Sequence, residues 1–356
     1  TMRILIDINH PAHVHYFRNF SAIMQGKGHA VLFVSRNKEM DHRLLNLYGF
    51  SYISRGRGSK GRIGKFLYLL YADFKLFRII KEYKADLCLN FLHPYPSQVA
   101  RLLGKVSLVF SDTEHAHLHH RLTVPFATKV FTPACYRTSL GKKQVRFNSY
   151  MELAYLHPNY FTPNQDVLQL LQLKEGEKFV IMRFVSWAAA HDFGHNGMSM
   201  ENKRAAIRAI APYAKVFITA EGPLPSDLEP YRIKIPLNKM HDALYYSSLL
   251  FGESATMASE AAVLGTPAIF LDNDGRGYTD EEEWKYGLVF NFKETIKDQE
   301  QAIKKAVEIL KDQAGKTKYC QMRQKLLSQS IDTTAFMVNE VLRYHPGNRF
   351  ALQNPQ

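Results

Sequence analysis

The sequence predicts an α/β protein of two domains, each built on a parallel β-sheet, with a helical C-terminal tail. Three observations support this fold class. The chain has 356 residues, which exceeds one domain of ~150 residues and suits two. Short apolar runs alternate with helical stretches in both halves, as they do in βα units. Between the halves, the segment 156–165 contains two prolines and two asparagines, so we place the crossing between the domains there.

The first half supplies the elements of one such domain, which we place at residues 1–160. Strands are predicted at 3–8, 30–35, 51–54, 86–90, 106–110 and 129–131. Helices are predicted at 15–25, 41–48, 65–84 and around 97–103. Gly26 and Gly49 mark the ends of the first two helices, because glycine readily adopts the left-handed conformation that ends a helix.

The second half repeats the alternation, and we place its domain at residues 161–335 with a helical tail at 336–356. Strands are predicted at 179–183, 215–219, 249–251, 267–271 and 288–290. Helices are predicted at 200–211, 241–247 and 256–264, and the stretch 295–344 is mostly helical. Parallel sheets bind ligands at the carboxyl ends of their strands, so we expect the ligand site in a cleft between the two domains.

The composition indicates a globular protein of a reducing compartment. Hydrophobic residues make up 46% and charged residues 22%, which excludes a disordered chain. Three scattered cysteines are too few for a disulfide framework and match no zinc pattern. No apolar run reaches the ~18 residues of a membrane span, and the first residues read as a strand rather than a signal peptide. We therefore expect a cytoplasmic protein.

The most informative motif runs from Gly252 to Pro267. A strand leads into the small residues Ser254, Ala255 and Thr256, which open a helix. The first N–H groups of a helix and its dipole form an anion site suited to a diphosphate. Glu260 lies about one turn further along, where a carboxylate can accept both hydroxyls of a ribose. A plain βαβ unit with a serine cap is the alternative interpretation.

Two polar loops follow strands of the first domain and are candidates for acid–base chemistry. The loop at 9–15 contains His10 and His13, and an imidazole can take up a proton near neutral pH. The loop after the 106–110 strand contains Asp112, Glu114 and His115, which could orient a histidine or act as the base. Capping and packing roles, for His10 and Asp112 in particular, remain open alternatives.

Further contacts to a bound donor are expected at carboxyl ends in the second domain. Arg183 ends a strand and can bind a diphosphate, with Ser186 close behind it. His241 precedes the helix that leads to the main motif, and Arg276 lies in the loop after the 267–271 strand. Glu282 or Glu283 could reach a sugar hydroxyl, although a solvated helix start explains that acidic run equally well.

The motifs together resemble those of GT-B-fold glycosyltransferases. The turn, the helix with its glutamate and the following Gly-x-Pro are similar to the nucleotide-sugar signature of the peptidoglycan N-acetylglucosaminyltransferase and of UDP-N-acetylglucosamine 2-epimerases. The chain resembles more closely a bacterial and archaeal GT-B-like family known as a domain of unknown function. The matching motifs are Asp7-Ile-Asn9-His10-Pro11-Ala-His13-Val14, Asp112-Thr-Glu114-His115-Ala116, Glu152-Leu-Ala-Tyr155-Leu-His157-Pro158, Thr256-Met-Ala-Ser-Glu260-Ala-Ala-Val-Leu-Gly265-Thr-Pro267 and Lys285-Tyr-Gly287-Leu.

This resemblance implies a GT-B fold, in which two Rossmann-like domains face each other across a cleft. It implies a nucleotide-sugar donor on the C-terminal domain and an acceptor on the N-terminal one. Such enzymes generally need neither a cofactor nor a metal, so we expect none. The alternative is a metal site formed by His117, His119 and His120 with His10, His13 and His115 nearby. His13 is the closest match to the first-loop histidine of the related transferase. Many GT-B proteins have Gly-Gly where this chain has Ser254-Ala255.

The net charge of +13 points to an anionic partner. Residues 51–84 contain nine Lys or Arg against two acids, a local charge of +7. The same segment includes the aromatic helix 65–84, on which Phe66, Leu70, Phe74 and Phe77 form one stripe that core packing explains. The alternative is that this segment rests on an anionic membrane, on the inner face, and presents the domain to a lipid-linked acceptor.

The sequence thus favours a glycosyltransferase that moves a sugar from a nucleotide-diphosphate donor, with UDP expected, to a glycan or lipid-linked acceptor in polysaccharide or cell-envelope biosynthesis. A UDP-N-acetylglucosamine 2-epimerase-like isomerase or hydrolase is the second hypothesis, with Asp112, Glu114 and Glu152 available as its carboxylates. A nucleic-acid-binding protein is a third, suggested by a pI of about 9.4. No nucleic-acid partner is expected, because the basic segment contains no known binding module.

Overall fold

The computed structural model describes residues 1–36, 39–56, 62–174, 176–184, 197–220 and 222–347. The described chain divides into two compact units. The first unit comprises residues 1–155 together with 331–356, and the second comprises residues 156–330. In the part of the chain that is described, no helix is long and apolar enough to cross a membrane.

The first unit is built on a seven-stranded sheet in which all neighbouring strands are parallel, in the order β3-β2-β1-β4-β5-β6-β7. Every residue of β4 is buried, and so are five of the six in β1. Such continuous apolar strands are typical of a parallel sheet covered on both faces. The strands are β1 (Arg3–Ile8), β2 (Ala30–Ser35), β3 (Tyr52–Ser54), β4 (Leu87–Phe91), β5 (Val106–Phe110), β6 (Lys129–Pro133) and β7 (Gln144–Phe147).

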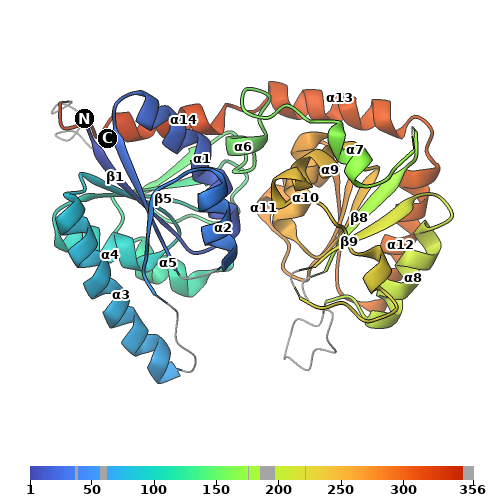
Figure 1. The fold of residues 1–356 in the computed structure, drawn as a ribbon, viewed down its shortest axis with the longest axis horizontal. Coiled ribbons are helices and arrows are strands. Elements are labelled where there is room, and N and C mark those ends of the chain that lie inside the picture. Colours follow the sequence, from blue (N-terminus) through green and yellow to red (C-terminus); the bar gives the residue numbers. More distant parts are fainter. Residues whose placement is uncertain (37–38, 57–61, 175, 185–196, 221, 348–356) are drawn as a thin grey trace. The chain divides into compact units, whose positions relative to one another are not determined.

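Helices cover both faces of this sheet (Figure 1). On one face, α1 (Pro11–Gly26) packs beside α2 (Glu39–Leu47). On the other, α3 (Arg62–Tyr83) packs beside α4 (Pro94–Leu102), which in turn contacts α5 (His117–Thr123). A buried core cluster joins the sheet to α3 and α4, and includes Leu5, Val34, Leu76, Ile80 and Val99.

The second unit has a five-stranded sheet, again with only parallel pairs, in the order β12-β11-β10-β8-β9. Two sets of helices cover it: α8 packs on α12, and α10 contacts α9, α11 and α13 (Figure 1). The strands are β8 (Phe179–Arg183), β9 (Lys215–Thr219), β10 (Leu249–Gly252), β11 (Ala268–Leu271) and β12 (Val289–Phe292). The helices are α7 (Asp166–Leu170), α8 (Met200–Ile210), α9 (Met240–Tyr246), α10 (Ala255–Leu264), α11 (Gly277–Trp284), α12 (Ile296–Lys311) and α13 (Gly315–Ser328).

The last helix, α14 (Thr333–Leu342), belongs to the first unit, where it packs on α1. Hydroxyl groups attach it: Thr333 donates to the carbonyl of Tyr150, and Thr334 donates to the carbonyl of Ala154. Ala154 belongs to the short helix α6 (Leu153–Leu156), so the second of these bonds joins α14 to α6. The chain therefore changes units after Tyr155 and after Ser330, whereas the sequence placed these boundaries after residues 160 and 335.

Two expectations about individual elements change. Helix α1 begins at Pro11 rather than at residue 15, because His10 caps it through its side chain and proline is well suited to the first helical turn. His13 therefore lies on a helix and not in a loop. The 144–147 strand was not predicted. It is a short edge strand with a single buried residue.

The predicted core stripe of α3 is wrong at Phe74, whose side chain is 65% exposed. The buried face of the helix instead contains Ala72, Leu76, Ile79 and Ile80. Apolar residues surround this helix on most sides, so spacing alone does not single out the face that packs.

Each sheet has one point where the strand order reverses. In the first unit it lies between β1 and β4, and in the second between β8 and β10. Loops leave the sheet in opposite directions there, so open α/β sheets bind ligands at the carboxyl ends of those two strands.

Gly252, at the end of β10, provides a test of how tightly the two central strands of the second sheet approach. A Cβ added there would lie 1.9 Å from the carbonyl oxygen of Arg183 on β8. We expect Gly252→Ala to destabilise the protein by about 3 kcal/mol, because the strands must separate. Thermal unfolding measures this. Gly26→Ala is the control, since a Cβ there has open space; equal melting temperatures for the two variants would contradict this account.

Candidate functional site

The segment from Gly252 to Pro267, proposed above to bind a diphosphate, begins at the switch point of the second sheet. Ser254 is the N-cap of α10, and its hydroxyl oxygen accepts the backbone N–H of Met257 at 3.3 Å. Ala255 and Thr256 form the first turn and are partly exposed. At the other end of α10, Gly265 ends the helix with a φ of 84°. The sequence interpretation of this segment as strand, capped turn and helix is therefore correct.

Two residues of the second unit that were predicted to bind the nucleotide-sugar donor contact each other. Nε2 of His241, on α9, lies 2.9 Å from Oε1 of Glu260 on α10. Both side chains are almost fully buried, and the ring of Phe161 stands edge-on to the imidazole. The buried contact between the imidazole and the carboxylate thus lies about one turn beyond the first N–H groups of α10.

The two predicted arginines lie on neighbouring elements. Arg183 ends β8, next to Gly252 of β10 in the parallel register, and is partly exposed. Arg276 is the N-cap of α11, and its guanidinium lies 3.6 Å from Asp272 and donates to the carbonyl of Gly275. Ser186 lies outside the described residues.

The two glutamates of α11 that were considered for a sugar contact, Glu282 and Glu283, both make hydrogen bonds within the second unit. Glu283 accepts the backbone and side-chain N–H groups of Asn291, both at 2.9 Å. Glu282 is fully buried and accepts the hydroxyl of Ser259 at 2.6 Å. Burial raises the pKa of Glu282 to about 8, although the Ser259 hydrogen bond opposes this shift. The predicted sugar contact of Glu282 is thus wrong, because no ligand can reach a fully buried side chain.

The predicted histidines of the first unit lie at the start of α1, after β1. Nδ1 of His10 accepts the backbone N–H of Ala12 at 3.2 Å, which is the capping role left open above. The buried ring of His13 packs on Phe91 with centroids 4.8 Å apart, and on Tyr16. The rings of the two histidines lie 5.8 Å apart.

The loop after β5 places its carboxylates near one hydroxyl donor and one backbone donor. Asp112 accepts the hydroxyl of Thr113 at 2.9 Å, and Glu114 accepts the backbone N–H of Arg137 at 3.3 Å. Both acidic side chains are buried, whereas His115 is exposed.

The other histidines of this region lie on or next to α5. His117 and His119 are exposed, and His120 is buried against the hydroxyl of Tyr136 at 2.7 Å. Burial, with the neighbouring histidines, lowers the pKa of His120 to about 4. Among the described residues, no group of three or more His, Cys, Asp or Glu side chains is placed to hold a metal ion.

Sequence reasoning missed the most deeply buried ionic cluster of the first unit. Asp7, on β1, has no exposed side-chain surface. Nε of Arg55, just after β3, lies 2.8 Å from one of its oxygens, and Nδ1 of His93, just after β4, bonds to the other. The Arg55 contact is an ion pair rather than an aligned hydrogen bond. Arg55 was expected in the membrane-facing basic segment, and its burial shows that this assignment was wrong.

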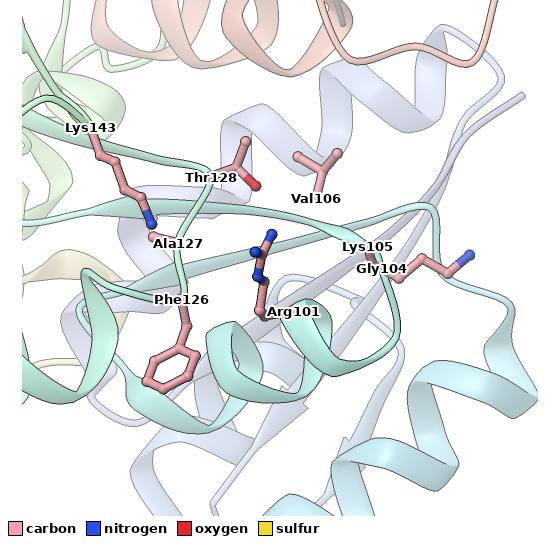
Figure 2. Close-up of a pocket in the computed structure, with 8 residues that line it drawn as sticks. All are labelled: Arg101, Gly104, Lys105, Val106, Phe126, Ala127, Thr128 and Lys143. Atoms are coloured by element: carbon pink, nitrogen blue, oxygen red, sulfur yellow. The ribbon is translucent and has the colours of Figure 1, made fainter. Parts of the chain in front are cut away.

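A basic hollow lies at the opposite edge of the first sheet. It lies between the amino ends of β5 and β6 (Figure 2). Its volume is about 410 Å³. Its lining contains three cations and no acid: Arg101, Gly104, Lys105, Val106, Phe126, Ala127, Thr128 and Lys143. The ammonium of Lys143 donates to the carbonyls of Val124 and Pro125. Because parallel sheets bind ligands at their carboxyl edge, this hollow is not part of the candidate site.

Comparison with solved structures identifies the fold of this protein. The UDP-GlcNAc 2-epimerase from Neisseria meningitidis bound to UDP-GlcNAc superposes with a TM-score of 0.67 at 13% identity, covering 96% of this chain and 100% of that one. The spinosyn rhamnosyltransferase SpnG complexed with thymidine diphosphate gives 0.62 at 13% identity, with the same coverages. With two Rossmann-like units and a helical C-terminal region, the protein has the GT-B fold.

The chain belongs to the family described as "Protein of unknown function (DUF354)", which it matches over residues 2–344. It is also 24% identical over 281 residues to the uncharacterized protein MJ0665 of Methanocaldococcus jannaschii, which covers 75% of this chain and 80% of that protein. The resemblance noted from the sequence motifs is therefore confirmed.

The raised pKa of Glu282 predicts a pH-dependent stability. Between pH 4.5 and about 8, the Glu282 carboxyl is protonated in the folded state and ionised in the unfolded state. The free energy of unfolding therefore falls as pH rises through this range. Glu282→Gln cannot lose that proton. We expect the melting temperature of the variant, relative to the native protein, to rise from pH 5 to pH 8. Glu281→Gln serves as the control on the same helix, and a difference independent of pH would contradict the assignment.

Proposed function

We propose that the protein is an enzyme acting on a nucleotide-diphosphate sugar, and that its second unit binds the nucleotide. The observation that carries this proposal is the first turn of α10 at the switch point of the five-stranded sheet. The N–H groups of Ala255 and Thr256 precede the first hydrogen bond within the helix, whereas the N–H of Met257 is bonded to the Ser254 hydroxyl. The helix dipole favours a diphosphate at this end. Arg183 on the neighbouring strand adds a positive charge.

Glu260 and His241 give this site its specificity for a nucleoside. A ribose hydroxyl that donates to Glu260 replaces the contact with His241, and the imidazole then remains beside the ligand. The solved structures support the ligand class, since the Neisseria epimerase is bound to UDP-GlcNAc and SpnG is complexed with thymidine diphosphate. We expect UDP in this chain.

The reaction we propose is transfer of the sugar to a glycan or lipid-linked acceptor, in polysaccharide or cell-envelope biosynthesis and without a metal or cofactor. The first unit would bind the acceptor. The sequence favours His13 as the base, and His10, Asp112, Glu114 and His115 are its other candidates. All five side chains follow β1 or β5, at the carboxyl edge of the first sheet.

An epimerase-like reaction is the second candidate, because one of the similar structures is a UDP-GlcNAc 2-epimerase. It requires carboxylates that remove a proton from the sugar carbon, and Asp112, Glu114 and Glu152 are buried acids of the first unit. Formation of an epimerised sugar without any acceptor would identify this reaction. A requirement for an acceptor would identify transfer.

The nucleotide site is tested by Glu260→Ala. Loss of a hydrogen bond to a charged group costs about 1.5–3 kcal/mol, so we expect nucleotide affinity to fall ~10- to 100-fold while the fold persists. A thermal-shift screen with UDP, GDP, CDP and dTDP sugars identifies the ligand, and calorimetry then measures its affinity. Glu201→Ala, an exposed glutamate on α8, is the matched control. Unchanged affinity in Glu260→Ala would contradict the assignment.

We also propose that the exposed side of α3 rests on an anionic membrane that contains the acceptor. Tyr71 and Phe74 are 50% and 65% exposed there and lie three residues apart, on the same side of the helix. Lys75 lies beside the Tyr71 ring. The exposed cations Arg78, Lys81 and Lys84 follow, while Arg55 is excluded by its burial. Anionic lipids complement this combination of aromatic and basic groups.

Flotation with phosphatidylserine vesicles tests this surface. Each cation near an anionic bilayer contributes ~1 kcal/mol, so reversing Arg78, Lys81 and Lys84 to Glu should weaken binding at least ~100-fold. Raised salt should release the native protein in the same way. The control reverses the exposed lysines Lys297, Lys304 and Lys316 of the second unit. If the native protein does not float at low salt, the membrane proposal is wrong.

A further inference from the structure

The buried cluster of Asp7, Arg55 and His93 occupies the switch point of the first sheet. Asp7 is on β1, and His93 follows β4 by two residues. These are the two strands between which the strand order reverses. A ligand held at this point of an α/β sheet meets the loops that leave those strands. The cluster thus lies where the fold binds ligands.

The contacts of His93 fix one ring nitrogen and leave the other available. Nδ1 bonds to the Asp7 carboxylate, so the proton of the neutral imidazole lies on Nδ1 and Nε2 carries the lone pair. Nε2 has no hydrogen-bond partner among the described residues. The His93 side chain keeps 8% of its surface exposed. A proton acceptor needs this arrangement.

The surroundings of His93 favour its neutral form and hold the imidazole in place. Burial lowers the pKa of His93, and the Arg55 and His119 charges act in the same direction, against the Asp7 carboxylate and its hydrogen bond. Arg55 compensates the charge of Asp7 and donates to the carbonyl of Ile8 at 3.3 Å. Its guanidinium also lies over the ring of Tyr95, which packs edge-on against the imidazole.

The backbone at His93 is held in a strained conformation. Leu92 has a φ of 43°, in the left-handed region that costs a non-glycine residue about 1 kcal/mol or more. The turn persists because Leu92 donates its N–H to Phe110, and His93 donates its N–H to the Asn90 side chain at 2.9 Å. The turn at Leu92 therefore fixes where His93 leaves the end of β4.

We infer that His93 is the general base of this enzyme, and that Asp7 and Arg55 are positioning residues that orient and balance it. The inference rests on the proposed function. In glycosyl transfer, the acceptor oxygen forms a bond to the anomeric carbon while its proton moves to Nε2 of His93. The bond from that carbon to the diphosphate oxygen breaks, and the nucleoside diphosphate leaves with the electron pair. Asp7 then faces a positively charged imidazolium, and solvent removes the proton.

The first measurement is turnover of the UDP-sugar that gives the largest thermal shift. UDP release is followed with water and with octyl glucoside as hydroxyl donors, and solvent deuterium entering the sugar reports proton removal from carbon. We expect His93→Gln to lower the rate ~10²- to 10⁴-fold with unchanged UDP affinity. The control is His42→Gln, a partly buried histidine whose Nε2 lies 2.8 Å from the hydroxyl of Ser35, at the end of β2.

The second measurement is the pH dependence of turnover, which separates a base from a structural histidine. The rate should fall at low pH as His93 takes up a proton. Asp7→Asn removes a charge that favours the protonated ring, so that fall should move to lower pH. If Asp7→Asn does not fold, because Arg55 is left buried and unpaired, the double variant Asp7→Asn/Arg55→Met removes both charges together.

The outcomes separate this inference from the proposed function. If no nucleotide sugar binds the native protein, the proposed function and the inference both fail. If one binds, the inference is overturned by full turnover in His93→Gln, or by loss of turnover in His13→Ala alone. It is also overturned if Asp7→Asn leaves the pH profile unmoved. It is overturned as well by a native protein that binds the donor but shows neither UDP release nor deuterium exchange, because its site then moves no proton.

Discussion

One buried carboxylate on strand β1 connects the two loops that follow β3 and β4. Asp7 has no solvent contact, and its two oxygens contact Arg55 after β3 and His93 after β4. Removing one partner of a buried ion pair typically costs about 3–5 kcal/mol, whereas replacing the whole pair by apolar groups is often neutral or stabilising. Stability alone is therefore a poor reason to keep these charges at this position. A role in orienting a reactive imidazole accounts for them.

In the second unit, the carboxylates of Glu260 and Glu282 differ in burial and in the groups they contact. Glu260 lies near the start of α10 and contacts His241, whereas Glu282 is sealed between α10 and α11 against Ser259. The pKa of Glu282 is raised to about 8 by burial, so the contact between these helices stays uncharged at neutral pH. The charged chemistry is thus restricted to the edge of the sheet, where α10 begins. The proposed ligand would contact Glu260 there, whereas Glu282 is fully buried.

Much of the fold follows from local patterns. β1, β8 and β9 match their predicted ranges because their runs are apolar and bounded by polar residues. Helix α10 was predictable from its cap and its terminal glycine. The core face of α3 was not, because a helix that is apolar on most sides packs according to its neighbours. Ser254 and Glu260 could be proposed because their spacing places both near one helix start.

Asp7 and His93 could not be found in the same way. They are 86 residues apart, and each has an ordinary local explanation: an acid within a strand, and a histidine before Pro94. Only the pairing of β1 with β4 brings them together. Arg55 was misassigned for a related reason, because a run of basic residues does not indicate which side chain is buried. The charge of +7 counted in residues 51–84 therefore overstates the surface charge. The aromatic and basic side chains that an anionic membrane would contact are those on the exposed side of α3.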